Sequence, residues 1–241
     1  MELSKRNIIL GCWQTLKRHL GLWILIMLFI FGINIIISTI QEKLLDNITT
    51  QTIIFMVSAY LFQAGLNLGM LKMALNIHRE KEVGFNQVFG SFHVLGIYIL
   101  TTLLYLTLIV FTASPGIILL MFSASADIIP ISDLWGLGGT SYIIPLLLII
   151  VPAVYTSIRL QFYDYFLIDN EVGAIEAIKK SINITNGYTG DLFVLGAILS
   201  TIVLISMIPL MIGLLISIPL TIMVNTGVYL KLKERNPLKV N

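Results

Sequence analysis

Long apolar stretches limit what this chain can fold into more than any other feature of its sequence. The first of them, Gly21–Ile40, contains no charged residue. A helix of about 20 apolar residues can cross the hydrocarbon core of a bilayer, and this run is too long for a signal-peptide core. Charged residues make up only 12% of the sequence, against about a quarter in soluble domains. We therefore expect a membrane protein and exclude an ordinary soluble domain.

The remaining apolar runs extend this prediction to a whole architecture. We expect an all-α fold, a polytopic membrane helix bundle of about six transmembrane helices with short cytoplasmic amphipathic helices. It would form a single integral membrane domain over residues 1–241. The spans are expected at about residues 20–40, 52–77, 92–122, 142–167, 192–209 and 214–230. Pro115-Gly116 predicts a kink or an early end in the third span.

Short segments with helical periodicity precede each pair of spans. Residues 1–19 predict an interfacial amphipathic helix, and residues 82–91 allow a second one. Residues 171–186 predict a cytoplasmic helix with a left-handed C-cap at Asn186-Gly187. Two explanations of this pattern remain open: a true internal repeat, or simply the hairpins that any protein with this many spans contains.

Basic residues are distributed unevenly between the two sides that these spans define. All of the 15 Lys and Arg residues except Lys43 lie on one side. Residues 123–140 contain no basic residue and are expected outside. Because basic residues accumulate in cytoplasmic loops, we expect a multi-pass protein of the cell membrane with both termini in the cytoplasm. The formal net charge of +2 is too small to indicate a nucleic-acid partner.

The N-terminal amphipathic helix carries a dense basic cluster. Its polar face bears Lys5, Arg6, Lys17 and Arg18, and Trp13 lies at the boundary of that face. Basic residues attract anionic headgroups, and Trp prefers the membrane interface. We therefore predict that these residues contact the inner leaflet. The lipid bilayer is then the general partner, with anionic lipid or another membrane protein as a more specific one.

Several polar residues fall within or near the predicted spans, where polar groups usually face the bundle interior. They are Asn34, Gln63, Asn67, Lys72, Arg159, Asp164 and Asn225. They predict either a polar path for a substrate or interhelical hydrogen bonds, and both interpretations remain open. Asp164 is either a proton or cation site or a hydrated carboxylate near the cytoplasmic end. Gly65 and Gly69 form a small-xxx-small pattern that predicts close helix packing.

Residue types typical of catalytic or metal sites are sparse. Cys12 is the only cysteine, and His19, His78 and His93 have no closely spaced carboxylate or cysteine partner. The zinc-protease helix and the phosphate-binding Gly-rich loop are absent. Serines within the spans have no histidine at a common depth. We therefore expect no catalytic residue, no metal site and no cofactor, and hence not an enzyme.

A family resemblance comes mainly from the second half of the chain. Its motifs are Tyr163-Asp-Tyr-Phe-Leu-Ile-Asp-Asn170, Ala174-Ile-Glu-Ala-Ile-Lys-Lys-Ser181, Asn186-Gly187, Ile212-Gly-Leu-Leu-Ile-Ser-Ile-Pro219 and Tyr229, together with Arg79-Glu-Lys-Glu-Val-Gly-Phe85 and Val88-Phe89-Gly90-Ser91-Phe92. These motifs resemble a prokaryotic family of uncharacterised six-span integral membrane proteins that includes the membrane domain of some glycerophosphodiester phosphodiesterases. The resemblance implies a helical bundle in a bacterial plasma membrane and supplies no active-site residues.

Together these observations favour a non-enzymatic multi-pass membrane protein that acts at the inner leaflet as an accessory, scaffold or immunity-type factor. The alternative is a small-molecule or lipid transporter that uses the polar groups inside the bundle. A contiguous polar cavity that reaches the middle of the bilayer would distinguish the transporter from the accessory factor.

Overall fold

A computed structural model describes residues 5–45, 49–125, 140–208 and 212–235, and every regular element in these ranges is a helix. In chain order the elements are α1 (Lys5–Arg18), α2 (Leu20–Leu45), α3 (Thr50–His78), the short 3-10 helices η1 (Phe85–Phe89) and η2 (Phe92–Val94), α4 (Leu95–Ser125), α5 (Thr140–Leu160), α6 (Tyr163–Asn170), α7 (Ala174–Thr185), α8 (Thr189–Met207) and α9 (Leu214–Arg235). The expected all-α fold is confirmed.

Six helical stretches among the described residues are long and apolar enough to cross a membrane. They are Leu20–Lys43, Thr50–His78, Phe85–Phe122, Ile143–Asn170, Thr189–Met207 and Leu214–Arg235. By length and composition, the chain is thus a multi-pass helical membrane protein. The loop expected outside, over residues 123–140, lies for the most part beyond the described residues.

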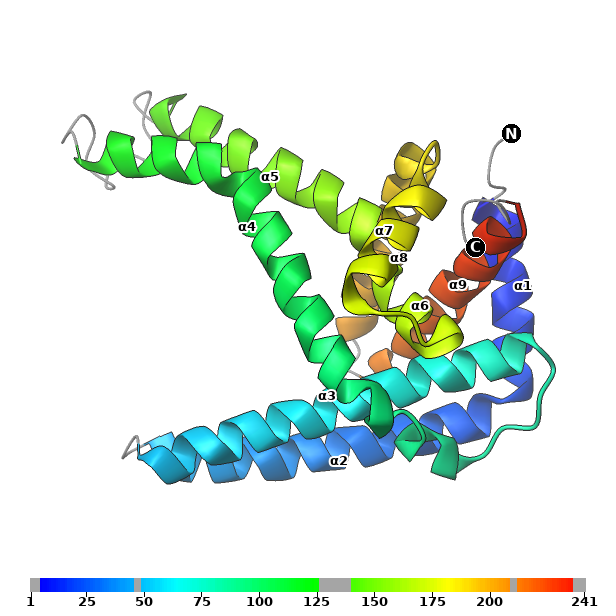
Figure 1. Ribbon diagram of the computed structural model, residues 1–241. Helices are drawn as coiled ribbons and strands as arrows, with labels where there is room; N and C mark the ends of the chain where they lie inside the picture. Colours follow the sequence, from blue (N-terminus) through cyan, green and yellow to red (C-terminus); the bar gives the residue numbers. More distant parts are fainter. Residues whose placement is uncertain (1–4, 46–48, 126–139, 209–211, 236–241) are drawn as a thin grey trace.

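The long helices form three hairpins, α2–α3, α4–α5 and α8–α9, and these diverge (Figure 1). The tips of the α2–α3 and α4–α5 hairpins point to the left in Figure 1 and lie far apart. At the opposite side lie α1, η1, α6 and the last turns of α3 and α9. These elements, together with α7, which packs on α6, are called the polar end below. Most of the basic residues are at this end.

The fourth span, which the sequence predicted at about residues 142–167, consists of two helices, α5 and α6. At the division, α7 supplies partners for backbone groups that a continuous helix would pair internally. Ser181 Oγ accepts from the Phe162 amide at 3.1 Å and donates to the Arg159 carbonyl at 3.0 Å. Thr185 Oγ1 donates to the same carbonyl at 3.2 Å. Such pairing allows a helix to break at membrane depth.

The second expected amphipathic helix, over residues 82–91, is instead the 3-10 helix η1 with flanking turns. Gly69 of α3 lies against the Val88 carbonyl of η1, so that a Cβ there would overlap the Val88 backbone. A Cβ on Gly65 would lie 2.6 Å from the Phe92 ring of η2. The small-residue pattern thus serves close packing, as predicted, and it packs on the two 3-10 helices at the start of the third candidate span.

Proline and glycine positions explain two further features of the backbone. α4 contains Pro115 and bends part-way along its length in Figure 1, as expected where a prolyl ring removes a helical hydrogen bond. Beside it, a Cβ on Gly116 would lie 2.6 Å from the Ile149 amide nitrogen, so α4 and α5 approach closely here. Gly187, with φ of 87°, follows the end of α7 in the left-handed conformation that the sequence predicted.

The densest packing lies at and near the polar end. Fully buried large side chains include Trp23 of α2, Met73 of α3, Phe166 of α6 and Tyr229 of α9. In the most apolar part of Phe85–Phe122, by contrast, only 11% of the residues are buried. The exposed side chains there are mostly Leu, Ile, Val and Phe. An apolar surface of this kind is expected to face lipid chains, which solvate it as well as a protein core would.

Replacement of Gly69 by Ala is expected to destabilise the protein, because the added methyl group overlaps the backbone of η1. Overpacking of this kind costs about 1–3 kcal/mol. Gly32→Ala, in the middle of α2, places its methyl group where no atom lies within 4 Å, so this matched control should not lower stability. Thermal unfolding in detergent measures both effects. Equal stability of the two variants would contradict the packing of α3 on η1.

Candidate functional site

The polar residues predicted inside the spans are dispersed in the structure. Asn34 and Asn67 are exposed, and the Asn34 amide donates to a carbonyl of its own helix, that of Ile30, at 2.9 Å. Arg159 lies at the end of α5 and donates to the Asn186 side chain, just after α7, at 3.2 Å. Each contact is a local or terminal one rather than part of a path through the bundle.

The other four candidates are partly buried: Gln63, Lys72, Asp164 and Asn225. Lys72 Nζ lies 3.5 Å from the Gly90 carbonyl, to which it donates. The Asp164 carboxylate accepts from the Tyr165 amide at 2.9 Å. Among the described residues, no hydrogen bond or ion pair joins any two of the seven candidates. A continuous polar path therefore stays a prediction.

A carboxylate at the end of α6 is the centre of an ion cluster. Asp169, whose side chain is 4% exposed, contacts Arg79 Nη2 at 2.6 Å and Lys233 Nζ at 2.7 Å. Tyr229 Oη donates to the same carboxylate at 3.1 Å, and Lys233 also donates to Asn170 at 2.7 Å. These contacts join the ends of α3, α6 and α9. Because two cations and a hydroxyl compensate one desolvated carboxylate, the cluster holds the three helices together.

Aromatic side chains pack beside this cluster. Tyr229 stacks on Tyr165 with ring centroids 5.0 Å apart, and it meets Phe166 edge to face at 5.2 Å. Aromatic pairs in these arrangements add to the free energy of burial. Three of the motifs that carry the family resemblance, residues 163–170, the segment that begins at Arg79, and Tyr229, therefore meet at one place although they are far apart in the sequence.

α1 packs its apolar face on α9 and on the end of α3. Cys12 and Leu16 are 6% and 1% exposed. Cys12 Sγ lies 3.7 Å from Nε2 of His78, whose Nδ1 is 3.0 Å from the Ala74 carbonyl. Gly227 permits this approach, because a Cβ there would lie 3.0 Å from Cys12 Sγ and 3.1 Å from His78 Nε2. Burial raises the pKa of the Cys12 thiol to about 11, so this thiol is protonated at neutral pH.

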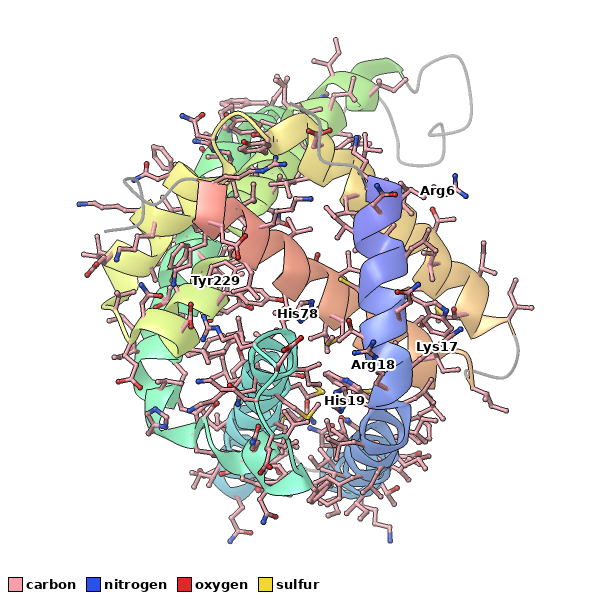
Figure 2. The ribbon with its side chains drawn as sticks, turned by 90° about the vertical axis from the view of Figure 1, so that its right-hand side faces the viewer. Arg6, Lys17, Arg18, His19, His78 and Tyr229 are labelled. Carbon is pink, nitrogen blue, oxygen red and sulfur yellow. The ribbon has the colours of Figure 1, made fainter. Side chains whose placement is uncertain are left out.

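An open groove lies beside this contact, between α1, the end of α3 and the end of α9, and we call it the α1 groove. It consists of two adjoining hollows of about 450 Å³ and 460 Å³, which share Thr15, Arg18 and His78. Its ionisable lining residues are Cys12, Arg18, His19, His78, Glu80, Lys81 and Lys231. Figure 2 shows Arg18 and His19 at one end of α1 and Arg6 at the other, with His78 to one side of the helix.

The residues predicted to contact the inner leaflet have different surroundings. Lys5 pairs with an aspartate of α8 at 2.8 Å. Lys17 Nζ lies 5.1 Å from the centre of the Trp13 ring, within cation–π range. Arg6 and Arg18 are exposed, and neither makes an ion pair within the described residues. The structure therefore leaves positive charge exposed on α1.

Sequence reasoning missed the ion cluster and the α1 groove. Asp169 was part of a resemblance motif, but only its place after an apolar segment hinted that it needs a cation when buried. The contact between Cys12 and His78 has no sequence signal, because the two residues meet across 66 positions of sequence. Within the described ranges, no group of three or more His, Cys, Asp or Glu residues is placed to hold a metal ion.

The chain belongs to the family described as "Protein of unknown function (DUF975)", whose model matches residues 7–236. No curated protein and no solved structure matches the chain. The family match covers almost the whole chain, and its range includes the motifs quoted above. A relationship to the membrane domain of glycerophosphodiester phosphodiesterases stays a prediction.

Asp169→Asn is expected to lower the melting temperature in detergent. The change leaves Arg79 and Lys233 facing each other without their shared counter-charge, and removal of one partner from a buried ion pair costs about 3–5 kcal/mol. Glu171→Gln is the control from the same segment, because the Glu171 side chain is 71% exposed and lies 3.8 Å from His93. If Asp169→Asn melts no earlier than Glu171→Gln, the cluster does not hold the helices together.

Proposed function

We propose that the chain is a non-enzymatic multi-pass protein of the bacterial plasma membrane that acts as an accessory or scaffold factor at the inner leaflet. The observation that carries this proposal is the placement of α1. In Figure 1, α1 turns away from the direction of α2 and lies across the end of the bundle. Its buried residues Cys12 and Leu16 pack on protein. If α2 spans the bilayer, a helix held in this way lies at headgroup level.

The distribution of charge supports a cytoplasmic location for the polar end. Within the described part of the chain, Lys43 is the one basic residue at the tip of a hairpin, near the end of α2. Arg6, Lys17 and Arg18 are exposed on α1 at the polar end. Because cytoplasmic loops carry the excess of Lys and Arg, this asymmetry favours cytoplasmic termini.

The same cations give α1 a means of acting on lipid or on an acidic membrane partner. A basic residue beside the membrane contributes about 1 kcal/mol of attraction to an anionic surface. The transport alternative receives less support, because its candidate residues are not connected to one another among the described residues. The sequence contains no recognised catalytic constellation, which favours a non-enzymatic role.

In an anionic bilayer, α1 is expected to be more protected than in a neutral one. Nanodiscs that contain phosphatidylglycerol should slow amide exchange over residues 5–18 relative to pure phosphatidylcholine, as measured by hydrogen–deuterium exchange mass spectrometry. The double variant Arg6→Gln, Lys17→Gln should show a smaller difference in exchange between the two lipids, because it loses about 2 kcal/mol of attraction to the anionic surface. Lys43→Gln, at a hairpin tip, should preserve it. Identical exchange of wild-type α1 in both lipids would refute a leaflet contact.

Orientation can be tested separately by cysteine labelling in a Cys12→Ser background. Lys43→Cys is expected to react with a membrane-impermeant maleimide in intact spheroplasts. Lys17→Cys should react only in inverted vesicles, because the positive-inside pattern places α1 in the cytoplasm. The opposite labelling pattern would reverse the topology and overturn the proposed inner-leaflet role.

A further inference from the structure

The α1 groove has an excess of positive charge that the ion cluster at Asp169 does not use. Arg18 and Lys231 line one hollow, and Arg18, His19 and Lys81 line the other. Glu80 is the one carboxylate that lines either hollow within the described residues. The cations outnumber this single anion even when the histidines are neutral. A groove lined by charge of one sign raises the local concentration of ions of the other sign.

The two principal cations of the groove also keep their donors available. Arg18 and Lys231 make no ion pair with a carboxylate in the part of the chain that the structure describes. Two nearby cations differ in this respect, because Arg79 and Lys233 are both bound to the Asp169 carboxylate. The planar guanidinium of arginine can offer two parallel N–H donors to phosphate oxygens, and lysine binds the same group as a point charge.

The rest of the lining suits a compact polar ligand. Gly11 of α1 lines the hollow that contains Lys231, and no atom lies within 4 Å of a Cβ placed on it, so the surface of α1 is open there. The amide side chains of Asn7 and Gln14 line the same hollow and offer uncharged donors. The size of each hollow is within the range of small-ligand sites, about 300–1,000 Å³.

We propose that the α1 groove binds a phosphate-bearing anion, with Arg18 and Lys231 as its main contacts and His78 beside them. Two sources can offer this group: the headgroup of an anionic phospholipid, or soluble phosphate and its esters. The lipid source rests on the proposed function, since it requires the polar end to lie at the inner leaflet. Binding of the phosphate group itself does not require that location.

Cys12 provides a reporter of occupancy, because it lines the groove and is the only cysteine in the chain. The residue is 6% exposed, and its Sγ lies in the contact with His78 and Gly227, so alkylation requires α1 to move away from α9. An anion bound to both Arg18 of α1 and Lys231 of α9 opposes that movement. Occupancy is therefore expected to slow alkylation of Cys12 by N-ethylmaleimide.

The test uses the full-length protein in a neutral detergent, titrated separately with dioctanoyl phosphatidylglycerol, dioctanoyl phosphatidylcholine and inorganic phosphate. We expect phosphatidylglycerol or inorganic phosphate to slow Cys12 alkylation in a saturable manner, and native mass spectrometry to detect the bound molecule. Arg18→Gln with Lys231→Gln should weaken binding about tenfold or more, because charge-assisted hydrogen bonds are lost. Lys179→Gln with Arg235→Gln removes the same charges from exposed positions outside the groove and should bind as the wild type does.

Each result supports or overturns the groove site. Protection by phosphatidylglycerol alone identifies a lipid headgroup as the ligand, whereas equal protection by inorganic phosphate identifies a soluble anion, and both support the site. Absence of binding to the wild type, or equal weakening in the two double variants, overturns it. If α1 still gains protection in anionic nanodiscs while the groove binds neither probe, the groove site fails and the proposed function stands.

Discussion

A buried carboxylate at the end of a membrane helix needs positive charge beside it, because water can no longer compensate its charge. Asp169 meets this need with Arg79 from α3 and Lys233 from α9. The same pairing positions the neighbours of these cations. His78 directly precedes Arg79, and Lys231 lies two residues before Lys233, which is about 200° around the helix. Lys233 therefore contacts α6 while Lys231 lines the groove beside α1, so the groove depends on the ion cluster.

The long helices could be predicted because hydrocarbon makes one demand of every span, an apolar sequence whose backbone is hydrogen-bonded internally. The end of α7 was also predictable, since Gly187 can adopt the left-handed conformation by itself. The division between α5 and α6 could not be predicted, because the side chains that pair with its backbone groups, those of Ser181 and Thr185, belong to another helix. The 3-10 helix η1 could not be predicted for the same reason, since it packs on Gly69 of α3, a separate helix.

The candidate site shows the same limit. Helical periodicity marked the face of α1 that contains Cys12 and Leu16, but it could not tell whether lipid or protein would cover that face. Arg18 and Lys231 are visible as basic residues in the sequence, whereas they line one hollow because α1 packs on the last helix of the chain. Asn34 is a polar residue within a span, yet its side chain donates to a carbonyl of its own helix. The type of a residue indicates the kind of partner that it needs, but it does not indicate which residue of the chain provides that partner.

The contrast between the packed polar end and the open hairpins has an energetic cause. Lipid chains are as apolar as Leu or Ile, so burial against another hairpin gains little over exposure to lipid. Strong interactions therefore concentrate where charges leave water, at the ends of α3, α6 and α9. An anion in the α1 groove would contact α1, α3 and α9 together. Its binding free energy would strengthen the association of these elements, which lipid alone leaves weakly associated. Occupancy of the groove would therefore be coupled to the arrangement of the hairpins.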